Sequence, residues 1–274
     1  MSVKNFDYNI DFTIQDLIDL KAHFGHRVGA LNPKMRDYVF GTKNGMSIID
    51  VRKTYVTAIK ALKICYKFSK LNKKILFVGT GSQISDIVKE NAERCNQSYI
   101  TDRWLGGVLT NWYTVSKSIK TLMSYKKILE DKENGLSKKE ILVMTKNYNK
   151  LMASFGGLTN LRGRPDLVIV FNTKIDYLAV KEALAIGIPT IALLDTNSDV
   201  TNVDYPIVSN DSNANVTRFF CSEFSKAIIK GAQDDMKDSG IDMSNILKEK
   251  RNKKITENEE NLEENSKENV DVVE

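Results

Sequence analysis

Residues 75–94 hold the first candidate for chemistry, an apolar run that passes through Gly79 and Gly81 directly into a helical pattern. A strand, a glycine turn and the start of a helix are the parts with which nucleotide-binding folds hold phosphate. The lysine of a P-loop is missing, and Ile84 stands where the dinucleotide pattern GxGxxG needs its third glycine. We therefore expect a structural turn, in which Ser82 caps the following helix.

Two acidic residues keep a catalytic alternative open. Asp102 follows the glycines by about 20 residues, where a ribose-binding acid would stand, and Asp195 follows a later apolar run. The alternative to a structural turn is a nucleotide-binding enzyme that uses the Gly79–Ser82 loop, Asp102 and Asp195. No serine, cysteine or histidine stands in the pattern of a nucleophile with its base. We expect no enzyme and assign no catalytic residue.

Candidates for metal binding are sparse. His23 and His26 are close together, but no third ligand is near them in the sequence. Asp195 and Asp199 could hold Mg²⁺ beside Thr80, yet acids at strand ends more simply satisfy free backbone groups. We predict no metal site and no cofactor.

The three cysteines are scattered and form no CxxC pair, as expected in a reducing compartment. The N-terminus is unlike a signal peptide, and no apolar run is long enough for a membrane helix. These features predict a cytoplasmic protein with no membrane partner.

Basic residues make the stronger case for a binding function. The whole chain carries a net charge of +5, but eight acids and one lysine between residues 257 and 274 contribute −7, which leaves +12 for residues 1–256. A body this basic favours a polyanionic partner, whereas the acidic tail is expected to be disordered. The residues expected to contact RNA phosphate are Arg27, Lys34, Arg36, Lys43, Arg103, Lys117, Lys120 and Lys126.

Apolar runs alternate with helical patterns through most of the chain. The runs that read as buried parallel strands are 75–78, 98–100, 167–171, 190–194 and 206–208. The helices expected between and after them are 83–94, 175–185 and 215–233. This alternation predicts an α/β fold, a flavodoxin-like doubly wound parallel five-stranded sheet.

The N-terminal part has a different pattern. Thr13 begins a short helix, and Asp50 caps a long one. Between them, residues 23–35 read as a loop, and 38–40 and 46–49 read as two short strands joined by a turn.

Residues 111–155 interrupt the alternation. They contain no strand but two heptad-like runs, separated by a break in which Ser137 and Glu140 form a capping box. We predict an inserted antiparallel coiled-coil helical hairpin, with nine lysines against four acids. The predicted division of the chain is an N-terminal helix with an extended basic loop and hairpin (1–50), the α/β domain (51–110 and 156–235), the coiled-coil insertion (111–155) and a C-terminal extension with the acidic tail (236–274).

Six motifs, taken together and in order, resemble the bacterial form of the ribosomal protein S two family. They are HFGHRVGALNPKM (23–35), FGTKNGMSIID (40–50), ILFVGT (75–80), RWLGGVLTNW (103–112), GRPDLVIVFNT (163–173) and AIGIPTIALLDTNSD (185–199). The resemblance implies a structural component of the small ribosomal subunit and not an enzyme. It also implies contacts with small-subunit rRNA and neighbouring ribosomal proteins, and a part in recruiting the large mRNA-binding ribosomal protein S one.

The chain departs from the family's pattern at two places. The family commonly has two basic residues after VGT, where this chain has Gly81 and Ser82. It often has tryptophan before NPKM, where this chain has Leu31. The first change removes a phosphate contact from the glycine loop, and the second removes a stacking partner.

Overall fold

The computed structural model describes residues 8–131 and 137–238. The chain divides into two units, Met1–Gly231 and Ala232–Glu274, and the first unit holds both sheets. The predicted acidic tail lies outside the described residues, and the predicted division of the chain into domains stays a prediction.

The first unit is built around a parallel sheet of five strands in the order β5-β4-β6-β7-β8. Numbered along the chain, this is 2-1-3-4-5, the strand order of the flavodoxin-like arrangement. Every residue of β4, β6 and β7 is buried, as expected for strands covered on both faces. The five predicted strands are confirmed with end shifts of at most one residue, and they are β4 (Ile75–Val78), β5 (Ser98–Ile100), β6 (Leu167–Val170), β7 (Thr190–Leu194) and β8 (Tyr205–Val208).

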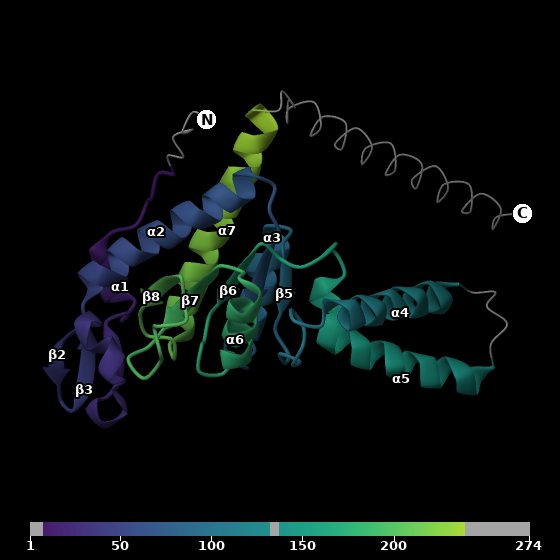
Figure 1. Ribbon diagram of the computed structural model, residues 1–274, viewed down its shortest axis with the longest axis horizontal. Coiled ribbons are helices and arrows are strands. Elements are labelled where there is room, and N and C mark those ends of the chain that lie inside the picture. The colour runs from purple at the N-terminus through teal and green to yellow at the C-terminus, as the bar shows by residue number, and fades with distance from the viewer. Residues whose placement is uncertain (1–7, 132–136, 239–274) are drawn as a thin grey trace, which may run out of the picture. The chain divides into compact units, whose positions relative to one another are not determined.

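Successive strand residues point to opposite faces of the sheet and enter two separate apolar clusters. Phe77 and Ile169 belong to the first cluster, together with residues of α1 (Ile14–Asp19), α2 (Val51–Lys70), α3 (Ser85–Arg94) and α7 (Ala214–Asp238). Leu76 and Val168 belong to the second, with α6 (Tyr177–Ile186) and the first half of α4 (Trp112–Glu130). Helices therefore cover both faces of the sheet, with α2 and α7 on one and α6 on the other (Figure 1).

The N-terminal module consists of a three-stranded antiparallel sheet in the order β1-β3-β2 and two 3-10 helices. Asn44 and Gly45 turn β2 into β3 with positive φ angles of 51° and 73°. The expected loop at 23–35 was wrong, because pairing with β3 makes a strand of its first residues, which a sequence pattern does not show. The elements are β1 (Phe24–Arg27), η1 (Val28–Ala30), η2 (Pro33–Tyr38), β2 (Val39–Lys43) and β3 (Met46–Ile49).

Helices α4 and α5 (Lys138–Phe155) lie side by side and form a helical hairpin (Figure 1). Ser137 and Glu140 make the predicted capping box at the start of α5. A short 3-10 helix, η3 (Gly156–Leu158), follows α5 and contacts β5. Coiled-coil packing of the two helices stays a prediction, and residues 132–136 of the predicted break lie outside the described residues.

Candidate nucleic-acid interface

The Gly79–Ser82 loop is filled from within the protein. Asp176 is 1% exposed, and its carboxylate accepts hydrogen bonds from the Thr80 backbone N–H (3.1 Å) and hydroxyl (2.7 Å). Burial raises the pKa of Asp176, against the lowering effect of these two bonds. The donor that a nucleotide phosphate would need is therefore already bonded to an acid of the protein.

Packing explains Gly79, the first glycine of this loop. A Cβ atom on Gly79 would lie 2.8 Å from the Val88 side chain, so the glycine lets α3 approach the sheet. The expected cap was wrong, because the helix begins later than predicted: Ile84 is the N-cap residue, and no side chain caps the helix. The structure therefore supports a structural turn in place of the catalytic alternative.

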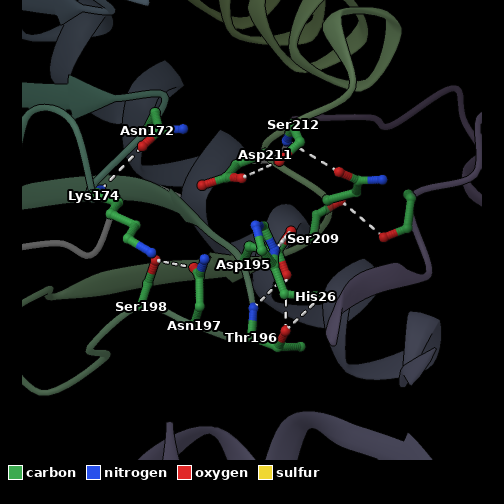
Figure 2. A network of polar contacts seen from close by, with 12 residues as sticks. His26, Asn172, Lys174, Asp195, Thr196, Asn197, Ser198, Ser209, Asp211 and Ser212 are labelled. Atoms are coloured by element: carbon green, nitrogen blue, oxygen red, sulfur yellow. Dashed lines mark hydrogen bonds and ion pairs between the residues drawn. The ribbon is translucent and has the colours of Figure 1, made fainter. Parts of the chain in front are cut away.

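His26 lies in a polar network at the carboxyl end of β7 (Figure 2). Its Nδ1 is 2.9 Å from the Asp195 carboxylate, and its backbone N–H donates to the Thr196 hydroxyl at 2.9 Å. Asp195 is 1% exposed. Burial, and then the neighbouring Asp195, raise the pKa of Asp211 to about 6.

His26, Asp195 and Asp211 bring one nitrogen and two carboxylate oxygens within 4.8 Å of one another. These are ligand types that a divalent transition metal takes, so this set could hold one. Sequence reasoning missed it, because the residues come from β1, the end of β7 and the segment after β8. The prediction of no metal site stays untested.

The magnesium pair considered from the sequence is not assembled. Asp199 accepts hydrogen bonds from Thr201 and from the Lys34 ammonium, the latter at 2.9 Å. The bonds from Thr201, and then the bond from Lys34, lower the pKa of Asp199 to about 2. Thr80 instead donates to Asp176. Each of these groups has a partner inside the protein.

The structure places the eight predicted RNA-binding residues in two regions. The first four belong to the N-terminal module: Arg27 ends β1, Lys34 and Arg36 lie on η2, and Lys43 ends β2. The other region follows β5, the strand at one edge of the five-stranded sheet. Arg103 lies just after this strand, and three lysines lie on α4, namely Lys117, Lys120 and Lys126.

All eight residues are exposed, but three of them have interactions within the chain. Lys34 pairs with Asp199, Lys126 lies 3.8 Å from Glu130, and the Lys117 ammonium lies 4.2 Å from the ring centre of Tyr113. Surface pairs of this kind contribute little to stability and exchange easily for a phosphate. The remaining cations have no ion-pair partner within residues 8–131 and 137–238, and they are Arg27, Arg36, Lys43, Arg103 and Lys120.

The loop formed by residues 104–110 is anchored by a residue that the sequence analysis did not single out. The Glu182 carboxylate of α6 accepts hydrogen bonds from the Trp104 indole N–H (3.0 Å) and from the Gly107 backbone (2.8 Å). It also accepts from the Leu109 backbone (3.0 Å) and from the backbone and hydroxyl of Thr110 (3.1 and 3.0 Å). The available signal was an acid on a helix whose other residues are mostly apolar.

Burial acts to raise the pKa of Glu182, but the hydrogen bonds from Trp104 and the loop backbone outweigh it and hold the pKa below its ordinary value. Glu182 is therefore a stable carboxylate at neutral pH. Arg103, which precedes this loop, stays exposed beside it.

The N-terminal module also exposes large apolar side chains beside its cations. Phe40 is 72% exposed, and Phe24 and Val28 are 37% and 42% exposed. Arg52 lies 5.9 Å from the ring centre of Phe40. Exposed aromatic and aliphatic groups beside cations are the composition of a surface that contacts another macromolecule.

Among the helices of the described part of the chain, none is long and apolar enough to cross a bilayer.

Comparison with known proteins agrees with these features. The family model for ribosomal protein S2 matches residues 17–231. The chain is 42% identical over 245 residues to the small ribosomal subunit protein uS2 of Rickettsia massiliae (strain Mtu5), an alignment that covers 89% of this chain and 83% of that protein. It is 43% identical over 235 residues to the protein of the same name from Rickettsia canadensis (strain McKiel), covering 85% and 80%. The chain belongs to the ribosomal protein S2 family, whose members are structural proteins of the cytoplasmic ribosome and not enzymes.

Proposed function

We propose that this protein binds small-subunit rRNA through its two cationic regions and holds neighbouring ribosomal proteins in place. The observation that carries the proposal is the set of exposed cations without an acidic partner in the described residues. They lie at strand ends (Arg27 and Lys43), in a loop (Arg103) and on the exposed sides of two helices (Arg36 and Lys120), where backbone phosphates can reach them. The net charge of +12 over residues 1–256 adds attraction for a polyanion at long range.

The two regions have different roles in this proposal. The N-terminal module contributes Arg27, Arg36 and Lys43, with Lys34 released from Asp199 when phosphate competes. Arg103 and the hairpin lysines contact a second stretch of rRNA. Two separated contacts within one compact unit of the chain would hold two rRNA segments in a fixed relation, which is a structural role.

Salt dependence tests the RNA contact. Binding of a small-subunit rRNA fragment is measured by filter binding at several KCl concentrations, and the slope of log K against log [salt] should be about −0.7 to −0.9 per phosphate neutralised. Arg103→Ala should make the slope less steep by about one contact. Lys60→Ala, an equal charge change on the exposed side of α2, is the matched control. A flat salt dependence would contradict the proposal.

We also propose that the exposed apolar group of the N-terminal module, Phe24, Val28 and Phe40, contacts a protein partner and helps to recruit ribosomal protein S one. Apolar side chains gain little from phosphate but much from burial against another protein. Phe40→Ala should weaken retention of purified protein S one on small subunits that carry this protein, while leaving the salt slope for rRNA unchanged. Equal retention by the variant and the parent would contradict this part of the proposal.

A further inference from the structure

The base of the helical hairpin is joined to the sheet domain by an unusual concentration of polar contacts. The Glu182 carboxylate receives five hydrogen bonds from residues 104–110, the segment that leads into α4. The carbonyl groups of two of these residues are bound as well, because the Arg164 guanidinium donates to the Leu109 carbonyl (3.0 Å) and the Thr110 carbonyl (3.3 Å). Glu182 thus binds backbone N–H groups of this turn, and Arg164 binds its backbone carbonyl groups.

The second leg of the hairpin is fixed at the same end. Gly157, just after α5, lies so close to β5 that a Cβ atom on it would be 2.2 Å from the Tyr99 carbonyl oxygen. Phe155 and Leu158 are buried in the apolar cluster that also contains Trp104. Both legs therefore leave the sheet domain from anchored positions.

Beyond this base, few side chains of the hairpin are buried. In α4 they are Val115, Ile119 and Leu122, all in its first 11 residues, and in α5 only Phe155 among its described residues. A helix of 19 residues is about 28 Å long, so a tilt of about 10° at its base moves its tip by about 5 Å and moves Lys117 and Lys120, which lie in its first nine residues, by about 2 Å. Contacts at the base consequently decide where the lysines of α4 lie.

We propose that Glu182 is a positioning residue for RNA binding: its carboxylate fixes the 104–110 loop and thereby the direction of the hairpin and the placement of Lys117 and Lys120. This inference rests on the proposed contact between hairpin and rRNA. The variant Glu182→Gln has nearly the same shape but keeps one oxygen acceptor. Its amide N–H₂ would face the donors that Glu182 now accepts, so the loop loses part of its anchor.

Spin-label distance measurements test the positioning role directly. Labels at Lys146→Cys on α5 and Lys60→Cys on α2 report the placement of the hairpin on the sheet domain, since both positions are exposed. The native thiols, Cys65, Cys95 and Cys221, are buried, and burial raises the pKa of each, so they stay unlabelled. In the full chain, Glu182→Gln should broaden the distance distribution about twofold, whereas the exposed Glu90→Gln on α3 should leave it unchanged.

Affinity for the rRNA fragment distinguishes a misplaced hairpin from the simple loss of a negative charge, because the two change the affinity in opposite directions. Loss of one negative charge alone would strengthen binding to rRNA, and Glu90→Gln measures that effect. Because the hairpin lysines are misplaced, Glu182→Gln should instead weaken binding of the rRNA fragment by about fivefold. In the double background with Lys117→Ala and Lys120→Ala, the same substitution should have no further effect on affinity.

The outcomes separate this inference from the proposed function. If the two lysine substitutions leave affinity unchanged, the hairpin does not bind rRNA, and the positioning role is wrong with it. If they weaken binding but Glu182→Gln neither broadens the distances nor lowers affinity, the inference alone is wrong. Should Glu182→Gln fail to fold, as judged by circular dichroism, Arg164→Lys replaces it. That variant keeps the charge, loses the paired donation to the loop carbonyls, and should give the same two changes.

Discussion

Two loops of this protein are held by acids of the same helix, yet their acids are in opposite electrostatic situations. After β4, Thr80 donates two hydrogen bonds to Asp176, the residue just before α6. After β5, four residues of the 104–110 loop, Trp104 among them, donate five hydrogen bonds to Glu182, in the second turn of α6. The pKa of Asp176 is raised, and that of Glu182 is lowered.

The depth of burial and the number of donors together explain the difference. Two bonds do not compensate Asp176 for nearly complete burial, whereas five bonds outweigh the partial burial of Glu182. The two loops consequently differ in use. In the first loop, the Thr80 donors are used within the protein. The backbone of the second loop is bonded to Glu182, and an exposed cation, Arg103, precedes it.

The largest expected effect separates the two acids by truncation. Glu182→Ala should lower the free energy of unfolding by about 3 kcal/mol, since several charge-assisted bonds are lost together. Asp176→Ala should lower it by about 1.5 kcal/mol, because fewer bonds are lost and the cost of burying the charge disappears. Urea denaturation of both variants, followed by circular dichroism, measures the difference. An equal or larger effect at Asp176 would show that donor number does not decide the contribution of these acids.

Glycine substitutions give the next effect. Gly157→Ala should destabilise the protein by about 2–3 kcal/mol, because its Cβ would meet the Tyr99 carbonyl oxygen at 2.2 Å. The backbone of a sheet strand cannot move away as easily as a side chain can. Gly79→Ala should cost about 1–2 kcal/mol, since its Cβ would meet a side-chain methyl group of Val88 at 2.8 Å. Thermal unfolding of the two variants compares them. A smaller effect at Gly157 would mean that the hairpin base is free to shift.

Sequence reasoning predicted the sheet well, because five apolar runs between helical patterns are a local signal. Ser98–Ile100 and Thr190–Leu194 were predicted to the residue. It failed for β1, whose four residues become a strand only by pairing with β3 across the sequence. Thr196 also packs against Gly25 of that strand, a contact 171 positions away in the chain.

The candidate site was predictable in part for the same reason. Cations such as Arg103, in a loop, and Lys43, at the end of β2, can be recognised by residue type, and the structure leaves both exposed. Glu182, Asp176 and Arg164 act through partners distant in sequence, so nothing in their local context announces the backbone groups that they bond.

The contributions of Asp176 and Glu182 to stability are expected to change with pH in opposite directions. The folded-state pKa of Asp176 is raised, so its contribution to stability is present below the unfolded-state pKa and lost as pH rises through the folded value. The folded-state pKa of Glu182 is lowered, so its contribution is present above the unfolded-state pKa and lost as pH falls through the folded value.

Urea unfolding between about pH 3 and 7 measures both contributions as wild type minus variant. The difference for Asp176→Asn should fall as pH rises, and the difference for Glu182→Gln should rise. Parallel slopes would contradict the assignment of burial to one acid and hydrogen bonding to the other.

The smallest expected effect distinguishes two serines that the sequence presented as equivalent caps. The Ser137 hydroxyl accepts a hydrogen bond from the Glu140 backbone N–H, and the Ser137 backbone N–H and hydroxyl donate to the Glu140 carboxylate. Ser137→Ala should therefore lower the free energy of unfolding by about 1 kcal/mol. Ser82 precedes a helix whose N-cap is Ile84, and its side chain caps nothing there. Ser82→Ala should therefore change stability by less than about 0.5 kcal/mol. A loss of about 1 kcal/mol at Ser82 in urea unfolding would restore the cap expected from the sequence and shift the start of α3 towards the Gly79–Ser82 loop.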